Sequence, residues 1–324
     1  MLSRFMNRRG AYKRSRTVAA QNSGFGFARA SKRYTVALAV AMIAALSAAV
    51  LLIAQQPPSA GGRGAGAARG GGGGGGFSQP DPIDFNDHTG WTSLFDGSTL
   101  GGWDGDTSYW RVENGAIVAE STCEKPTGTI YLVWQRGEAA DFEMKLEMRG
   151  EGAAINSGVQ YRGAIQMPRT TPAAPPRAPQ GICPSGQPRG APPSAASQTK
   201  WDMSGAQFDF DGRNAYSGQY YEQATGRGIV AWRGQVVRTQ QGKKPQLLAT
   251  LGDRDELGGY VKIENWNQLH IIARGNTLTH IINGHVMSIL IDDDPTMFKK
   301  SGLIGFEIEG TGKIGIRNIW LKKL

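Results

Sequence analysis

Two stretches of alternating sequence place carboxyl and amide side chains on one face of an extended chain. In QFDFD the two Phe side chains point one way, and Gln207, Asp209 and Asp211 point the other way. Near the C-terminus Glu307 and Glu309 alternate with apolar residues in the same manner. Carboxyl groups on one sheet face can orient sugar hydroxyls or transfer protons. We therefore expect Asp209 and Asp211 to be acid/base or sugar-orienting groups, with a solvated outer face as the alternative.

A third alternation follows the sequence NSG, where Gln160 and Arg162 are expected to share one face. The amide and the guanidinium would bind sugar hydroxyls, as would Gln207. If the three strands are neighbours in the sheet, their polar faces form one concavity. The sequence alone does not show whether they are neighbours.

Aromatic and charged residues gather between residues 216 and 234. Sugar rings stack on aromatic side chains, and their hydroxyls pair with charged groups. We expect Tyr221 and Trp232 to stack on the ring, Arg227 and Arg233 to bind hydroxyls, and Glu222 to act as an acid or base. A turn held by an Arg–Glu ion pair is the alternative.

Other chemistries lack their signatures. The four histidines and two cysteines do not have the spacing of a zinc site. No nucleophile elbow, phosphate loop or dinucleotide fingerprint is present. No metal or cofactor is therefore expected, although DFDG and DDD supply oxygen ligands and leave calcium as an open alternative. His280 alternates with apolar residues and is expected to be a packed histidine.

The elements that must position these residues are short strands. Apolar–polar alternation at period two predicts strands at 110–112, 116–119, 129–134, 142–148, 158–161, 207–210, 228–232, 268–273, 277–282, 285–290, 303–307 and 313–321. Asn-Gly pairs such as Asn114-Gly115 are strong hairpin signals. This pattern predicts an all-β fold, a two-sheet antiparallel jelly-roll sandwich.

The N-terminal region has the pattern of an export segment. Residues 1–34 carry nine Lys or Arg and no acid, and residues 35–54 are uncharged and almost wholly apolar. We expect a hydrophobic helix within 1–54, either a cleaved signal peptide or an N-terminal membrane anchor. The Gly/Pro-rich residues 55–82 would be a flexible linker. The chain is thus expected to be exported and periplasmic, extracellular or membrane-anchored facing outward, with membrane contact only through this segment.

The remaining residues, 83–324, are expected to form one domain with a Pro-rich insertion at 168–198. The formal net charge of +9 belongs to the N-terminal segment, because residues 77–324 hold 25 Lys and Arg against 27 Asp and Glu. A nucleic-acid partner is therefore not expected. Cys123 and Cys183 would pair only if the fold brings them together, which the sequence leaves open.

An ordered series of motifs resembles the 3-keto-disaccharide hydrolase family. The series begins at GWTSLFDG (90–97) and continues with WRVENG (110–115), DFE (141–143), NSGVQYR (156–162), YE (221–222), GRG (226–228), ENWN (264–267), NG (283–284) and RNI (317–319). The resemblance implies a concanavalin A-like sandwich acting on glycosides oxidised at C3. A C3 ketone acidifies the C2 proton, so a base can remove it, the C1 substituent can leave, and water can then add.

One departure from the family lies near the C-terminus. Relatives commonly carry Gln and His where this chain has Glu307 and Glu309. If these two glutamates form part of the site, the departure implies a changed chemistry or substrate, or lost activity. The resemblance as a whole implies a carbohydrate-active enzyme, in which Glu307 and Glu309 belong to the substrate-binding group and the arginines bind hydroxyls or stabilise an enolate. A non-catalytic glycan-binding module is the alternative, and a structural envelope protein is the third reading.

Overall fold

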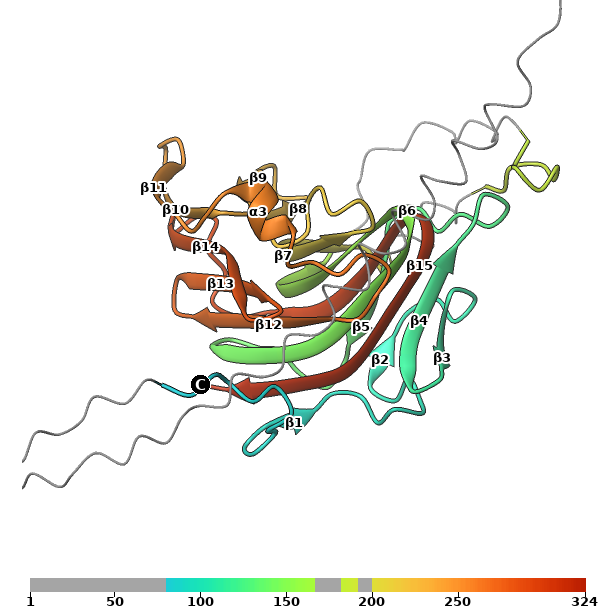
Figure 1. The fold of residues 1–324 in the computed structure, drawn as a ribbon, viewed down its shortest axis with the longest axis horizontal. Coiled ribbons are helices and arrows are strands. Elements are labelled where there is room, and N and C mark those ends of the chain that lie inside the picture. Colours follow the sequence, from blue (N-terminus) through green and yellow to red (C-terminus); the bar gives the residue numbers. More distant parts are fainter. Residues whose placement is uncertain (1–79, 167–181, 192–199) are drawn as a thin grey trace, which may run out of the picture. The chain divides into compact units, whose positions relative to one another are not determined.

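The computed structural model describes residues 80–166, 182–191 and 200–324. Strands are the dominant secondary structure of this part, so the all-β prediction is confirmed (Figure 1). The predicted N-terminal helix and nearly all of the linker lie outside the described residues. The elements in chain order are β1 (Thr92–Ser93), β2 (Trp103–Asp104), β3 (Trp110–Glu113), β4 (Ala116–Ser121), β5 (Ile130–Trp134), β6 (Phe142–Ile165), β7 (Met203–Asp211), β8 (Tyr220–Gln223), β9 (Gly228–Ala231), β10 (Gln235–Gln240), β11 (Gln246–Thr250), α3 (Arg254–Gly258), β12 (Asn267–Arg274), β13 (Thr277–Ile282), β14 (His285–Asp293) and β15 (Leu303–Lys323).

Two long antiparallel strands, β6 and β15, hold the fold together (Figure 1). The first part of β6 pairs with β12, and from β12 the sheet continues with β13, β14, β10 and β11 in that order. Its second part pairs with β7, and β8 and β9 follow. The other edge of β15 pairs with β5 and then with β4. Each long strand therefore takes part in two groups of strands.

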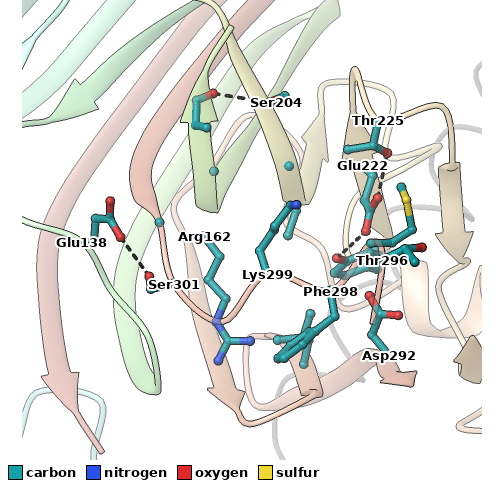
Figure 2. Close-up of a pocket in the computed structure, with 18 residues that line it drawn as sticks. Glu138, Arg162, Ser204, Glu222, Thr225, Asp292, Thr296, Phe298, Lys299 and Ser301 are labelled. Carbon is teal, nitrogen blue, oxygen red and sulfur yellow. Dashed lines mark hydrogen bonds between the residues drawn. The ribbon is translucent and has the colours of Figure 1, made fainter. Parts of the chain in front are cut away.

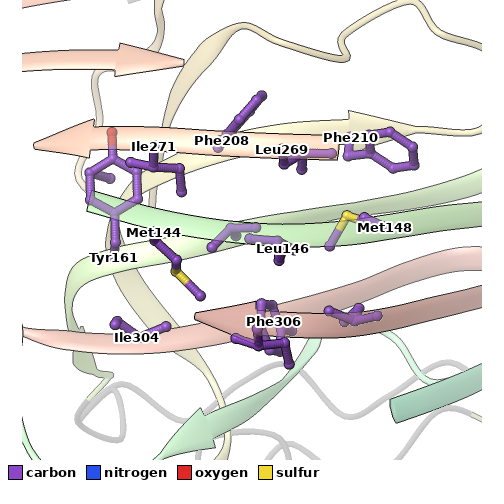
Figure 3. Packing of buried hydrophobic residues seen from close by; sticks show 14 of the residues in the cluster. Met144, Leu146, Met148, Tyr161, Phe208, Phe210, Leu269, Ile271, Ile304 and Phe306 are labelled. Carbon is purple, nitrogen blue, oxygen red and sulfur yellow. The ribbon is translucent and has the colours of Figure 1, made fainter. Parts of the chain in front are cut away.

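The two groups face each other across one hydrophobic core. Figure 3 shows Phe208 and Phe210 of β7 with Met144 and Leu146 of β6 in this core. Between the groups, the ring of His280 in β13 stacks on Phe208 with centroids 4.2 Å apart. His280 is fully buried, and burial lowers its pKa to about 3, so it is neutral. The expectation of a packed histidine is confirmed.

Several strands extend or add to the predicted set. Predicted strands 142–148 and 158–161 are the two ends of β6, and 303–307 and 313–321 both belong to β15. Strands β1, β2, β8, β10 and β11 were not predicted. The Asn114-Gly115 turn lies between β3 and β4, with φ values of 49° and 75° as a type I′ turn requires.

A disulfide ties the described part of the Pro-rich insertion to the sandwich. Cys123 and Cys183 are bonded, with Cα atoms 5.7 Å apart, which answers the question that the sequence left open. Nearby, the Gly190 amide donates to the Cys123 carbonyl at 2.9 Å. Most of the predicted insertion, 168–198, lies outside the described residues. Within the described part of the chain, no helix is long and apolar enough to span a membrane.

Candidate functional site

One row of residues crosses four strands on the face that points away from the core. Tyr131 of β5 lies opposite Glu307 of β15, Glu307 lies opposite Gly158 of β6, and Gly158 lies opposite Asp209 of β7. Gly158 is required here, because a Cβ atom would lie 2.8 Å from Nε2 of Gln207. The missing side chain lets the Gln207 amide lie across β6 between the two carboxyl groups.

Gln207 joins the two carboxyl groups through a single nitrogen. Its Nε2 donates to Asp209 Oδ1 at 3.0 Å and to Glu307 Oε2 at 2.5 Å. The Tyr131 hydroxyl lies 3.0 Å from Glu307 Oε1, and Gln219 Nε2 donates to Asp209 Oδ2 at 2.6 Å. All five side chains are buried. The arrangement is a fixed polar network in which two acids are close neighbours.

The pKa values of both acids are shifted into the neutral range. Burial raises the pKa of Asp209 to about 8, against the lowering effect of the hydrogen bonds from Gln219 and Gln207. Burial likewise raises the pKa of Glu307 to about 8, and the charges of Glu309 and Asp209 add to the shift. Two interacting carboxyls titrate as a pair. Near neutral pH this pair holds at least one proton and can exchange it.

The pair opens into a cleft of about 210 Å³ on the outer face. We call it the outer-face cleft; it is lined by Asn156, Gln207, Asp209, Tyr216, Gln219, Tyr221, Gln223, Ile229, Glu307 and Glu309. Glu309 accepts hydrogen bonds from Thr129 Oγ1 and Asn156 Nδ2, each at 2.9 Å. The predicted residues Gln207, Asp209, Tyr221, Glu307 and Glu309 are therefore brought together.

Asp211 lies next to this cleft but organises a loop. Its Oδ1 accepts from the backbone amides of Tyr216 at 2.7 Å and Ser217 at 2.9 Å, and its Oδ2 accepts from that of Ala215 at 3.0 Å. A carboxylate held in place by several amide donors has little freedom to act on a substrate. This geometry favours a structural role over the predicted acid/base role.

Glu222 lies on the opposite face of the β8 sheet from Tyr221 and is therefore separated from Asp209. Its carboxylate is paired with Arg227, which also contacts Asp292 Oδ2 at 2.6 Å. Burial lowers the pKa of Arg227, but the hydrogen bonds that it donates to both carboxylates raise its pKa above the usual value overall. The Tyr220 hydroxyl donates to Glu222 at 3.0 Å. The contact between Glu222 and Arg227 is the Arg–Glu ion pair that the sequence left as the alternative to an acid or base role.

Glu222 and Asp292 line a second, separate cavity of about 330 Å³. Figure 2 shows Glu222, Thr225 and Asp292 close together, with Arg162 apart from them. The predicted residues are therefore dispersed: some line the outer-face cleft, Arg162 and Glu222 line this cavity, and others line neither.

The expectation that Gln160 and Arg162 share one face is wrong. Arg162 has left-handed backbone, with φ of 46°, at an irregularity of the β6–β7 register. The local bulge turns its guanidinium away from the cleft, toward the carbonyls of Ala140 and Gly275 at 2.8 Å each. Gln160 stays on the face of Gln207 and is buried, and no described partner binds its amide.

The remaining predicted sugar ligands lie outside both sites. Arg233 donates to the backbone carbonyls of Arg254 at 2.8 Å and Ser217 at 2.9 Å, so it braces loops. Trp232 packs under the guanidinium of Arg254, which lies 4.6 Å from a ring centroid. Neither residue lines the outer-face cleft. The distance in sequence between Tyr221 and these two residues did not indicate that their side chains would point away from the outer-face cleft.

Two residues of the network were not predicted. Tyr131 lies in IYLVW, where both faces of the strand are buried, so its position does not mark it as part of a polar site. Gln219 precedes β8 within a loop, where no periodicity applies. The only available signal was Gly158, because glycine inside a strand indicates a close approach of other groups.

Among the described residues, no group of three or more His, Cys, Asp or Glu side chains is arranged to hold a metal ion. Of the stretches that left calcium open, Asp211 accepts amide hydrogens and Asp292 binds Arg227 and Thr239. The side chains that converge in the outer-face cleft are suited instead to proton transfer and to binding hydroxyl groups.

Comparison with known proteins identifies related sequences and folds. A family model described as "3-keto-alpha-glucoside-1,2-lyase-like domain" matches residues 90–322. No curated protein matches the chain.

Solved structures with a similar fold include three carbohydrate-related proteins. A candidate glycosyl hydrolase from Parabacteroides distasonis is 16% identical, with a TM-score of 0.42, covering 76% of this chain and 100% of that one. Carbohydrate binding module CBM66 from Bacillus subtilis is 8% identical, with a TM-score of 0.39, covering 68% and 96%. A Bacillus licheniformis beta-glucanase is 10% identical, with a TM-score of 0.38, covering 71% and 95%.

Proposed function

The chain belongs to the 3-keto-alpha-glucoside-1,2-lyase-like family, a carbohydrate-active family, and from this premise we propose that it cleaves glycosides whose sugar is oxidised at C3. The outer-face cleft is the proposed site. The observation that carries the proposal is the pair of buried acids, Asp209 and Glu307, whose pKa values are both raised to about 8.

The proposed reaction needs a base and an acid at the same time. The ionised member of the pair removes the proton at C2, which the C3 ketone has acidified, and an enolate forms. The bond between C1 and the leaving oxygen then breaks, and the protonated member gives its proton to that oxygen. Water adds across the resulting double bond between C1 and C2 to complete hydrolysis. One proton enters and one leaves the pair, so its charge is restored.

The surrounding groups support this use of the pair. Gln207 holds both carboxyls, so their separation is fixed before substrate binds. The Tyr221 ring lines the cleft, where it can stack on a sugar ring. The carboxyls touch the same amide nitrogen and therefore do not flank a scissile bond in the way that the acids of ordinary glycosidases do.

Glycan binding without catalysis is the second candidate. The family resemblance implies Gln and His at the positions of Glu307 and Glu309, and this departure would change the chemistry of the face. Export of the chain, by the N-terminal segment, is a separate proposal that rests on the sequence pattern of residues 1–54.

An assay of product release tests the proposal. The purified chain is incubated with an aryl 3-keto-glucoside and with the unoxidised aryl glucoside, beside Asp209→Asn and Glu256→Gln, an exposed acid on α3. We expect release from the keto sugar only. The rate should be reduced about 100-fold or more in Asp209→Asn and should be unchanged in Glu256→Gln. Equal rates in both variants would refute a role for the pair. Binding of glycans without release would establish the second candidate.

A further inference from the structure

The outer-face cleft is one-sided in charge. Three carboxyl side chains line it, from Asp209, Glu307 and Glu309, and no Lys, Arg or His does so among the described residues. The negative charges act on each other, because Glu309 raises the pKa of both Asp209 and Glu307. A group with negative charge would be repelled here, and a positive group would be attracted.

Glu309, like Asp209 and Glu307, has no partner of opposite charge among the described residues. Its two oxygens accept from Thr129 and Asn156, which are neutral donors, and no described cation pairs with it. It is also partly exposed, whereas Asp209 and Glu307 are buried. A ligand can therefore reach Glu309 without displacing an ion pair.

A second acceptor in the same cleft lacks a donor. Gln219 is only 2% exposed and lines the cleft, and its Oε1 atom has no hydrogen-bond partner among the described residues. Its amide nitrogen is already bound to Asp209. A buried acceptor without a partner is costly, so a ligand or water that donates hydrogen bonds would be stabilised beside it.

The position of Glu309 along β15 separates it from the reacting pair. It lies two residues beyond Glu307 on the same face, which corresponds to roughly 7 Å along a strand. That separation is comparable to the length of one pyranose unit. A group bound to Glu309 would therefore belong to the sugar next to the one held by Asp209 and Glu307.

We propose that this adjoining sugar carries a protonated amino group, which Glu309 binds, so that the cleft takes amino-sugar glycosides and rejects acidic ones. The inference deepens the proposed function and rests on it for the identity of the reacting sugar. The ammonium group supplies the hydrogen-bond donors and the positive charge that the three carboxyls lack. Uronic acid units would add a further negative charge to the same space.

Calorimetric titration of the full-length chain with stable probes tests the proposal. The probes are the glucosamine disaccharide with free amines, its N-acetylated form, cellobiose, and a disaccharide ending in glucuronic acid. At about pH 5.5 most of the amines carry a proton, and the titrations are run there. We expect the free-amine probe to bind about tenfold more tightly than cellobiose, and the acidic probe to bind most weakly.

Variants separate Glu309 from general charge effects. Glu309→Gln should bring the free-amine probe to within about threefold of cellobiose, whereas Glu256→Gln on α3, an exposed residue away from the cleft lining, should leave both affinities and their tenfold ratio unchanged. Salt should weaken only the free-amine probe. The proposal is overturned if the amine gives no advantage, if N-acetylation does not reduce binding, or if Glu309→Gln retains the preference.

The aryl 3-keto-glucoside assay, run on the same preparation, keeps the two ideas distinct. Keto-sugar cleavage without an amine preference would contradict this inference alone and leave the proposed function standing. An amine preference that depends on Glu309, without keto-sugar cleavage, would contradict the proposed function and support the cleft as an amino-sugar binding site.

Discussion

Replacing Glu307 by Gln should lower the pKa of Asp209 by a predictable amount. The variant removes a neighbouring carboxylate and keeps a side chain of similar size. The two charges interact, because the charge of Asp209 raises the pKa of Glu307. Oxygens of the two acids bind the same Gln207 nitrogen, at 3.0 and 2.5 Å. Taking a charge separation of roughly 5 Å and an effective dielectric constant of about 20, their repulsion is about 3 kcal/mol, or about 2 pKa units.

Burial is the largest cause of the shift and remains in the variant, so the pKa of Asp209 should not return to its ordinary value. We expect the pKa of Asp209 to fall from about 8 to roughly 6–7. The fall is smaller than the full repulsion because the wild-type pair holds a proton, so Glu307 is not always charged when Asp209 ionises. NMR titration of ¹³C-labelled carboxyl groups, in both proteins, measures this directly.

The rate should report the same change. In the wild type the reactive form of the pair holds one proton, so kcat/KM for an aryl 3-keto-glucoside should pass through a maximum with pH. In Glu307→Gln the falling limb should disappear and the rate should drop about 100-fold or more, since the acid is lost. Asp209 titrating with an ordinary carboxyl pKa in the wild type, or an unchanged pKa in the variant, would refute the reasoning.

Three further predictions concern stability. Because folding raises the pKa values of Asp209 and Glu307 to about 8, their contribution to stability is complete below the unfolded pKa of about 4 and is lost as pH rises through 8. The Tm of the wild type should therefore fall between about pH 6.5 and 8, and the Tm of the double variant Asp209→Asn/Glu307→Gln should fall less over the same range. An equal fall of Tm in the two proteins would contradict this. Arg227→Met should lower the free energy of unfolding in urea by about 3–5 kcal/mol, since two buried carboxylates lose their cation, and a loss below about 1 kcal/mol would argue against the ion-pair network. Reducing the disulfide between Cys123 and Cys183, which are 60 residues apart, should cost about 2–4 kcal/mol in the same assay, and Cys123→Ser/Cys183→Ser should show no further effect of reductant.

The strands were readable from the sequence because alternation follows directly from burial on one face. Every predicted strand falls within an observed one or extends a residue past its end. The strand β11 was missed because all of its residues are exposed and it has no apolar face to reveal it. The continuity of β6 and β15 was also missed, since Gly and Ala residues at the bends interrupt the pattern without breaking the strand.

The candidate site was predictable only where it follows the strand period. Gln207, Asp209 and Glu307 meet because their strands are separated by β6 alone, which alternation cannot show. Arg162 could not be placed, since a single bulged residue with left-handed backbone reverses the direction of its side chain. Glu222 is adjacent to Tyr221 in β8, so their side chains point to opposite faces of the sheet. The grouping of aromatic, acidic and guanidinium residues in sequence had favoured a single site for both.

The central claim is that the outer-face pair removes the C2 proton of a 3-keto sugar, and a deuterium label tests it most directly. The purified chain is given an aryl 3-keto-glucoside carrying deuterium at C2, and loss of the label is followed beside aryl release. The account predicts that the label passes to solvent, that release is slower than from the unlabelled sugar, and that both processes are lost in Asp209→Asn. Aryl release with full retention of the C2 label, or unchanged label loss in Asp209→Asn, would contradict it.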